Sequence, residues 1–301
     1  MMQRLTSIII FFVYIITLIS SSRTYTYNGR YTASGEPLDI TIEGEVDVYD
    51  YLLSYCHLFK SEELCYEAMD GISWYMYGFS FYTPQHPNRT LEDSKFSRGS
   101  VLATLIKTFQ YQKYLEIGCD LDTVFNAIKE LVPTAVGVDP ARGGTLRMTS
   151  DEFFAQNKEH FDLIYIDGLH TAEQTILDIQ NSLQVLTPGG SIVIHDCNPR
   201  FEYRQHRSSQ IYNGDVWKVV AFLRNADDVE VVTVDVDHGV AVLRRRPNLH
   251  PLPALLQLKL LAPAPGVSML DALSYQDLDN HRAEVLRLVT VAEFRQWMME
   301  S

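Results

Sequence analysis

The stretch FDLIYIDGLHTAEQTILDIQNSLQVLTPGGSIVIHD, residues 161–196, decides the fold class of this chain. It begins and ends with short apolar runs, FDLIYI and SIVIHD, which are typical of strands buried in a sheet. The segment between them carries apolar residues at helical spacing, at Ile176, Ile179, Leu183 and Leu186. A strand, a helix and a second strand in this order predict a βαβ unit, in which the two strands lie parallel.

The same alternation continues on both sides of this unit. Further strands are expected at KYLEIG, TAVGVDP and, more weakly, TLRMT, which are residues 113–118, 134–140 and 145–149. Helices are expected at residues 101–109, 122–132 and 215–224, and Asp122 is the expected N-cap of the second. A hairpin around Asp237-His238-Gly239 closes the pattern. We therefore predict an α/β fold with a mostly parallel, doubly wound sheet and a final antiparallel strand.

The composition is that of a globular protein and argues against one class of partner. Of the 301 residues, 46% are apolar and 21% are charged, which is not a disordered composition. The formal net charge of −13 argues against nucleic acid as a partner, because binding to a phosphate backbone needs a basic surface. The net charge says nothing about a small ligand.

The first 22 residues differ from the rest of the chain. Arg4 precedes an apolar run from Ile8 to Ile19, and three serines follow that run. The pattern is typical of a secretory signal peptide, since the run is short for a membrane span. An uncleaved membrane anchor is the second interpretation, and a core strand or buried helix is the third. We expect a protein of the secretory pathway or one anchored to a membrane, with the cytoplasmic face as the alternative.

These patterns divide the chain into four segments. Residues 1–22 are the signal peptide or anchor, 23–100 an N-terminal extension, 101–246 the α/β domain, and 247–301 a C-terminal helical extension. The N-terminal extension is aromatic and irregular and contains no motif of known chemistry.

Polar residues collect where the predicted strands end. They are Glu116, Asp139, Asp167, His195 and Asp196. Ligands of such sheets bind beyond the carboxyl ends of the strands. The first loop, EIGCDLDTVF, contains only Gly118, and its Asp120 and Asp122 would repel a phosphate. This loop disfavours a nicotinamide dinucleotide and favours S-adenosylmethionine, which carries a sulfonium and no phosphate, while Asp139 suits ribose hydroxyls.

Six motifs of the chain together resemble one family of enzymes. The motifs YLEIGCDLDTVF, VGVDP, GGTLRMTSDEFF, FDLIYIDGLHTAEQTILDI, LTPGGSIVIHDCNP and NGDVWK resemble, in this order, a class I S-adenosylmethionine-dependent methyltransferase of family 24. The resemblance covers roughly residues 101–246. It implies a Rossmann-like sheet of seven strands with the last strand antiparallel, and methyl transfer as the activity. It also implies that Glu116 and Gly118 lie in the donor loop, Asp139 at the ribose, and Ser150 and Asp151 near the adenine.

The resemblance also suggests a metal site and a base. Small O-methyltransferases of the catechol type have a similar fold and hold a divalent cation near the end of the fourth strand. Asp167 and Asp196 fall at two of those ligand positions and suit Mg²⁺, whereas Cys197 replaces the third ligand. His170 falls at the place of a basic residue, so we predict His170 and Asp196 as catalytic residues that act on the acceptor proton near neutral pH.

Several of these residues have a simpler alternative. Asp167 could line the donor pocket in a site without metal. His170 could merely precede a helix whose start is capped by Thr171 and Gln174. His195 could be a hydrogen-bonded structural residue, which is the commoner fate of a single histidine.

The expected function follows from these residues. The connection from Cys197 to Lys218 is long and locally basic, which favours an anionic or sugar-like acceptor, although a solvated surface loop is equally compatible with it. We expect S-adenosylmethionine-dependent methylation of a hydroxyl on a small polar or glycan-type acceptor, with Mg²⁺ as a second candidate cofactor. The alternatives are a non-catalytic binding module of the same fold and, less favoured, a nicotinamide-dependent oxidoreductase.

Overall fold

The computed structural model describes residues 23–27, 38–42, 88, 93, 96–207 and 212–300, and the chain divides into two compact units, residues 1–83 and 84–301. The predicted targeting segment, residues 1–22, lies outside the described residues. In the first unit, strands β1 (Arg23–Tyr27) and β2 (Leu38–Ile42) pair antiparallel. Across the described ranges, none of the helices combines the length and the apolar character needed to cross a membrane.

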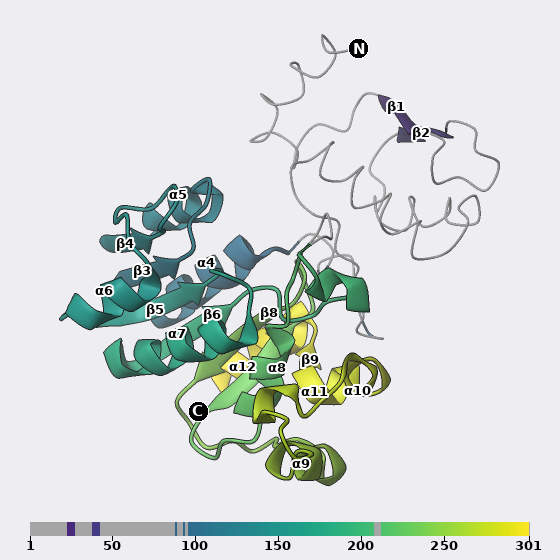
Figure 1. Cartoon of the computed structure of the whole chain (residues 1–301). Coiled ribbons are helices and arrows are strands. Elements are labelled where there is room, and N and C mark those ends of the chain that lie inside the picture. The colour runs from purple at the N-terminus through teal and green to yellow at the C-terminus, as the bar shows by residue number, and fades with distance from the viewer. Residues whose placement is uncertain are drawn as a thin grey trace. The chain divides into compact units, whose positions relative to one another are not determined.

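A seven-stranded sheet forms the centre of the second unit (Figure 1). The strands are β3 (Lys113–Ile117), β4 (Thr134–Val138), β5 (Phe161–Ile166), β6 (Leu186–Ile194), β7 (Glu230–Val234), β8 (Val240–Arg244) and β9 (Leu288–Val289). Their order across the sheet is β4-β3-β5-β6-β8-β7-β9. Only β8 runs antiparallel to its neighbours, and the other described pairings in this sheet are parallel. This confirms the predicted seven-stranded α/β sheet with an antiparallel strand from the closing hairpin.

The seventh strand comes from an unexpected part of the chain. The weak strand expected at 145–149 is reduced to a single parallel bridge between Leu146 and Val138. Gly143 and Gly144, both with positive φ, turn the chain just before it and leave almost no length to pair. Instead β9, from the C-terminal segment, pairs parallel with β7 through Thr233 and Val234.

Helices cover both faces of the sheet (Figure 1). They are α4 (Arg98–Phe109), α5 (Thr123–Lys129), α6 (Ser150–Gln156), α7 (Ala172–Val185), α8 (Trp217–Leu223), α9 (Ala254–Leu261), α10 (Tyr275–Asn280), α11 (Arg282–Leu286) and α12 (Val291–Met299). The described part of the second unit also contains the short 3₁₀ turns η3 (Glu202–Gln205) and η4 (Met269–Asp271).

The two faces of the sheet bury separate cores because side chains alternate along each strand. On β5, Leu163 and Tyr165 join the core made with α4, α5 and α12, whereas Ile164 and Ile166 join the core made with α7, α8 and α11. The amphipathic helix predicted between the strands FDLIYI and SIVIHD is α7, which lies between β5 and β6. Its Ile179 is fully buried.

The C-terminal segment belongs to the same unit as the sheet. Besides β9, it supplies α12, whose Phe294 and Trp297 are buried against the core of α4 and α5. Residues 84–301 form one compact unit, and the predicted segment boundaries after residues 100 and 246 stay predictions.

Candidate active site

The predicted polar residues lie at one edge of the sheet, because β4, β3, β5 and β6 are adjacent and parallel. The chain leaves β3 for β4 on one side and later returns to β5 on the other, so the topological switch point lies between β3 and β5. Gly118, with φ +87°, approaches the backbone there so closely that a Cβ would lie 2.3 Å from the carbonyl oxygen of Asp167. The first loop and the end of β5 therefore meet at the switch point.

Asp167, His170 and Asp196 are brought together at this edge. The Nε2 atom of His170 lies 3.3 Å from Oδ1 of Asp167, and its Nδ1 atom lies 3.1 Å from Oδ2 of Asp196. The imidazole ring therefore bridges the two carboxylates with its two nitrogens. Asn213, which is fully buried, donates from Nδ2 to Oδ1 of Asp196 at 2.6 Å.

The position of His170 depends on a contact with the segment before α8. His170 has φ +57°, and Gly214 packs so tightly on it that a Cβ at Gly214 would lie 1.7 Å from its carbonyl oxygen. Asp215 then accepts a hydrogen bond from the backbone N–H of Ala172, at 2.8 Å. Gly214 and Asp215 of the motif NGDVWK therefore dock onto the start of α7, whereas Asn213 reaches the end of β6.

The predicted cap of α7 is present in part. The Oγ1 atom of Thr171 accepts from the backbone N–H of Gln174 at 3.4 Å, as expected. The side chain of Gln174 does not close a capping box, however, because it donates to Asp151 at 3.2 Å and to Asp178 at 3.1 Å.

The charges of the cluster shift the pKa values of His170 and Asp196 in opposite directions. Burial by itself lowers the pKa of His170, but Asp196 and Asp167 beside it raise that pKa to about 9. Burial raises the pKa of Asp196, whereas His195 and His170 lower it to about 2. With its raised pKa, His170 is a charge partner of both carboxylates, and its role as a base near neutral pH stays a prediction.

His195 is buried and fully engaged. Its Nε2 atom lies 2.8 Å from the carbonyl oxygen of Asp237, and its Nδ1 atom lies 3.1 Å from Asp167 and 3.3 Å from Asp196. The polar end of β6 therefore has partners in both β5 and the hairpin between β7 and β8.

Two residues of the cluster were missed by sequence reasoning. Arg98, in the first turn of α4, places Nη1 3.2 Å from Asp167 and 2.9 Å from Nδ1 of His195, and Nε 3.1 Å from Asp237. Asp237 is visible in the sequence only as a turn residue of the hairpin. Nothing in the local sequence of Arg98 distinguishes it from an exposed arginine at a helix start, since its partners are distant in the chain.

The cluster contains three side chains of the kinds that bind divalent cations. One ligand atom each from Asp167, His170 and Asp196 lies within 4.8 Å of the others. However, Oδ2 of Asp167 faces the Arg98 guanidinium and accepts from Tyr165 at 2.8 Å, and its Oδ1 faces two histidine nitrogens. A carboxylate with donors on both oxygens, one of them a guanidinium, does not suit Mg²⁺, which demands an octahedral set of oxygens.

The residues after Asp196 do not supply a third oxygen ligand. Cys197 is fully buried. The side chain of Asn198 is committed elsewhere, because it accepts from Arg282 at 2.7 Å and donates to Asp235 at 3.1 Å. The residues present do not fit Mg²⁺.

Asp139 joins the two loops that follow β3 and β4. Its Oδ2 accepts from the backbone N–H groups of Cys119 and Asp120, at 3.1 and 3.0 Å, and its Oδ1 accepts from those of Ala141 and Arg142, both at 2.8 Å. Burial raises the pKa of Asp139, but these four donors lower it below its ordinary value. The carboxylate therefore shapes the first loop, and its predicted contact with a ribose stays a prediction.

The other predicted donor-binding residues lie around this loop. Asp122 occupies the N-cap position of α5, but its carboxylate accepts from the backbone N–H of Gly144 at 2.6 Å and does not cap the helix. Glu116 is buried, and burial raises its pKa to about 8. Ser150 and Asp151 both lie at the start of α6 beside Gln174, at 3.4 and 3.2 Å.

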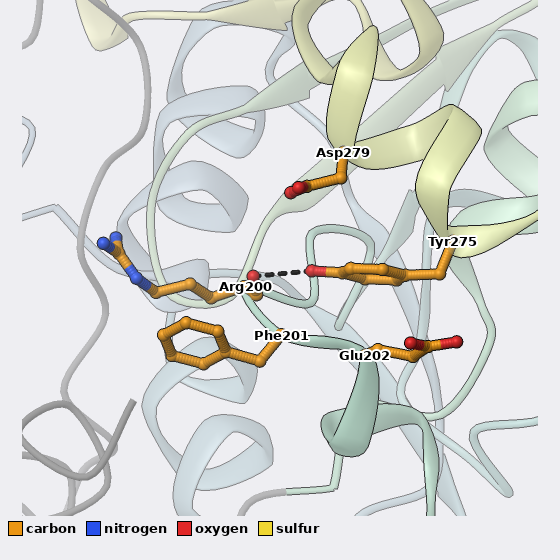
Figure 2. Close-up of a pocket in the computed structure, with 5 residues that line it drawn as sticks. All are labelled: Arg200, Phe201, Glu202, Tyr275 and Asp279. Atoms are coloured by element: carbon orange, nitrogen blue, oxygen red, sulfur yellow. Dashed lines mark hydrogen bonds between the residues drawn. The ribbon is translucent and has the colours of Figure 1, made fainter. Parts of the chain in front are cut away.

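The long connection after β6 is more ordered than a solvated loop over the part that is described, residues 197–207 and 212–218. Arg204 is buried, and Arg282 donates to the carbonyl oxygen of Pro199 at 2.7 Å. A pocket of about 250 Å³ lies beside this segment, lined by Arg200, Phe201, Glu202, Tyr275 and Asp279. In Figure 2 the Tyr275 hydroxyl donates to the carbonyl oxygen of Arg200, at 2.6 Å. The charges of the pocket residues are mixed, so they do not single out an anionic ligand.

Part of the chain matches a known protein family. Residues 101–197 match the family described as a methyltransferase domain, which confirms the resemblance to methyltransferase family 24 over that segment. No curated protein matches the chain.

Solved structures with a similar fold include three methyltransferases. A putative caffeoyl-CoA O-methyltransferase from Staphylococcus aureus is 14% identical, with 49% of this chain and 82% of that one covered and a TM-score of 0.40. The SAH-bound methyltransferase PaMTH1 from Podospora anserina is 14% identical, with 69% and 100% covered and a TM-score of 0.41. The O-methyltransferase TomG from Streptomyces achromogenes, in complex with SAM, is 14% identical, with 50% and 79% covered and a TM-score of 0.36.

Proposed function

We propose, from the methyltransferase domain that residues 101–197 form, that this protein transfers a methyl group from S-adenosylmethionine to a hydroxyl of a small polar or glycan-type acceptor. The observation that carries the proposal is the sheet edge where Glu116, Gly118, Asp139 and Asp167 lie at the ends of adjacent parallel strands inside the matched segment. An acidic edge favours a ligand with a sulfonium and an ammonium group, and it repels a pyrophosphate.

The residues of the cluster suggest how the acceptor loses its proton. When bound, S-adenosylmethionine supplies a methyl group on a positively charged sulfur. The acceptor oxygen forms its bond to the methyl carbon while the carbon–sulfur bond breaks, and the hydroxyl proton must leave. We propose that Asp196 and His170, whose Oδ2 and Nδ1 atoms lie 3.1 Å apart, act together to take up this proton. Asn213 and His170 hold the carboxylate of Asp196 in place.

Calorimetry with S-adenosylmethionine, and separately with NAD, tests the proposal. We expect saturable binding of S-adenosylmethionine and weaker or no binding of NAD. Asp139→Ala should weaken donor binding by about 1–3 kcal/mol, because it removes the acceptor of four N–H groups that shape the first loop. Glu159→Ala is the matched control, since this exposed carboxylate pairs only with Lys113 among the described contacts. Tighter binding of NAD would contradict the proposal, and absence of donor binding would favour a non-catalytic module.

The identity of the acceptor and the location of the protein in the cell are each checked by a separate experiment. Incubation of the protein with labelled S-adenosylmethionine and fractionated cell extract would identify the acceptor. If none of the transferred label were attached to a hydroxyl oxygen, O-methylation would be contradicted. The apolar run within residues 1–22 supports a secretory or membrane-anchored location. Expression with a fluorescent tag at the C-terminus checks this, because a uniformly cytosolic signal would exclude it.

A further inference from the structure

We propose that Arg98 is the built-in cation of the strand-end cluster and a positioning residue for Asp167 and His195, so that the site keeps its arrangement without a divalent metal ion. The consequence for turnover rests on the proposed methyltransferase function. The consequence for metal binding does not, because it follows from the charges of the cluster alone.

Arg98 is held in place from one side by Asp237. The carboxylate Oδ2 of Asp237 accepts from the backbone N–H of Arg98 at 3.0 Å and lies 3.1 Å from its Nε atom. Asp237 thus fixes both the start of α4 and the plane of the guanidinium. Such a group is pre-organised, since its planar fork loses little freedom when it binds a further acceptor.

The free end of the guanidinium contacts the site. Its Nη1 atom lies 3.2 Å from Oδ2 of Asp167 and 2.9 Å from Nδ1 of His195. The same carboxylate oxygen accepts from Tyr165, and Oδ1 faces His170 and His195. Arg98 therefore sets the orientation of the carboxylate that ends β5 and of the imidazole that ends β6.

This arrangement explains how two acidic strand ends can lie together. Two buried carboxylates in contact with the same histidines repel each other unless positive charge lies between them. His170 lies between the two carboxylates, and Arg98 adds a positive charge beside Asp167 that remains at every pH of interest. A divalent ion at the same place would have to bind Asp167 beside the guanidinium, and the two cations would repel each other.

Both members of the Arg98–Asp237 pair lie outside the segment that matches the family model. Arg98 precedes residue 101, and Asp237 follows residue 197. The matched segment alone thus supplies the strand-end carboxylates but not the pair that orients them.

The test compares wild type with Arg98→Gln, Asp237→Asn and the double variant R98Q/D237N. The double variant removes a half-buried charge pair as a unit, so it leaves no uncompensated carboxylate at residue 237. Lys107→Gln is the matched control, because it removes an exposed positive charge from the same helix. Measurements are melting temperature, binding of Mn²⁺ by electron paramagnetic resonance, binding of S-adenosylhomocysteine, and turnover before and after EDTA treatment.

The expected result has three parts. Wild type binds no Mn²⁺ at about 1 mM and keeps its turnover after EDTA. R98Q/D237N folds, loses turnover by about 10–100-fold through kcat, and gains a Mn²⁺ site that Asp167→Asn removes. Lys107→Gln behaves as wild type in each measurement.

Other outcomes would overturn the inference. Recovery of wild-type turnover in the double variant would show that Arg98 serves only to neutralise Asp237. If wild type bound one Mn²⁺ tightly and Asp167→Asn did not, the cluster would be a metal site and the inference would be wrong. This comparison does not depend on any variant of Arg98. Failure to bind S-adenosylhomocysteine would instead count against the proposed function, while the Mn²⁺ titration would still decide the role of Arg98.

Discussion

At the scale of single residues, His170 shows how one side chain acquires its role from its neighbours. Its left-handed backbone, with φ +57°, turns the chain between β5 and α7, and the ring then lies between Asp167 and Asp196. Two carboxylate partners raise the pKa of His170, and we propose that the ring acts together with Asp196 on the acceptor proton.

His170→Asn tests this role with little backbone change, since asparagine tolerates the left-handed region better than most residues. The variant removes the positive charge between the two carboxylates, so turnover should fall by about 100-fold. Turnover is measured with labelled donor, and circular dichroism checks that the fold is kept. Undiminished turnover would mean that only the backbone of His170 matters.

At the scale of elements, loops from distant parts of the chain hold one another. Gly214 and Asp215, before α8, dock on the start of α7, and the segment after β4 docks on the loop after β3. Each contact places a backbone group that a strand or helix alone would leave mobile, so the candidate site depends on pairs of loops.

Gly214→Ala, with Gly189→Ala as its control, tests whether docking of the segment before α8 holds His170 in place. Both glycines have positive φ, so each alanine should cost about 1–2 kcal/mol in backbone strain. A Cβ at Gly189 meets nothing within 4 Å, whereas a Cβ at Gly214 would lie 1.7 Å from the carbonyl oxygen of His170. Urea denaturation should therefore show a larger loss for Gly214→Ala, with turnover lowered by about 100-fold because His170 moves. Equal effects of the two variants on turnover would contradict the docking role.

At the scale of the second unit, the C-terminal segment completes the sheet. Strand β9 covers the edge of β7, and α12 buries Phe294 and Trp297 against the core. A segment that supplies both a strand and a core helix contributes to the cooperative stability of the whole unit.

Phe294→Ala should destabilise the second unit by about 3–5 kcal/mol, because it opens a cavity at a fully buried position. Met299→Ala, at an exposed position of the same helix, should change stability by no more than about 0.5 kcal/mol. Chemical denaturation measures both. A small effect of Phe294→Ala would show that α12 is a detachable extension.

Glu230 predicts how the stability of this unit depends on pH. This buried carboxylate on β7 pairs with Arg287 and Arg246 and accepts from Nε1 of Trp297 at 2.9 Å. Burial raises its pKa, but these partners bring it below the ordinary value in the folded state. Its contribution to stability is therefore fully present above the unfolded pKa of about 4.3 and is lost as pH falls through the lower folded pKa.

Glu230→Gln should consequently be less stable than wild type at pH 7, and the difference should shrink as the pH falls below about 4. Urea midpoints of the two proteins across this range provide the measurement. A difference that stays constant with pH would show that the carboxylate charge does not contribute. Asp228→Asn, which removes an exposed carboxylate near the start of β7, is the control.

The sequence by itself determined the βαβ alternation, the antiparallel strand of the closing hairpin and the collection of Asp167, His170 and Asp196 at strand ends. These features depend on local periodicity and on the rule that parallel strands end at one edge. Only the tertiary structure decided that β9 is the seventh strand, that Asp139 is occupied by four backbone N–H groups, and that Arg98 and Asp237 join the cluster. The physical reason is distance along the chain. A pattern of neighbouring residues indicates which face of a strand or helix a residue occupies. The charged partners of that residue depend on packing between segments that are far apart in the sequence.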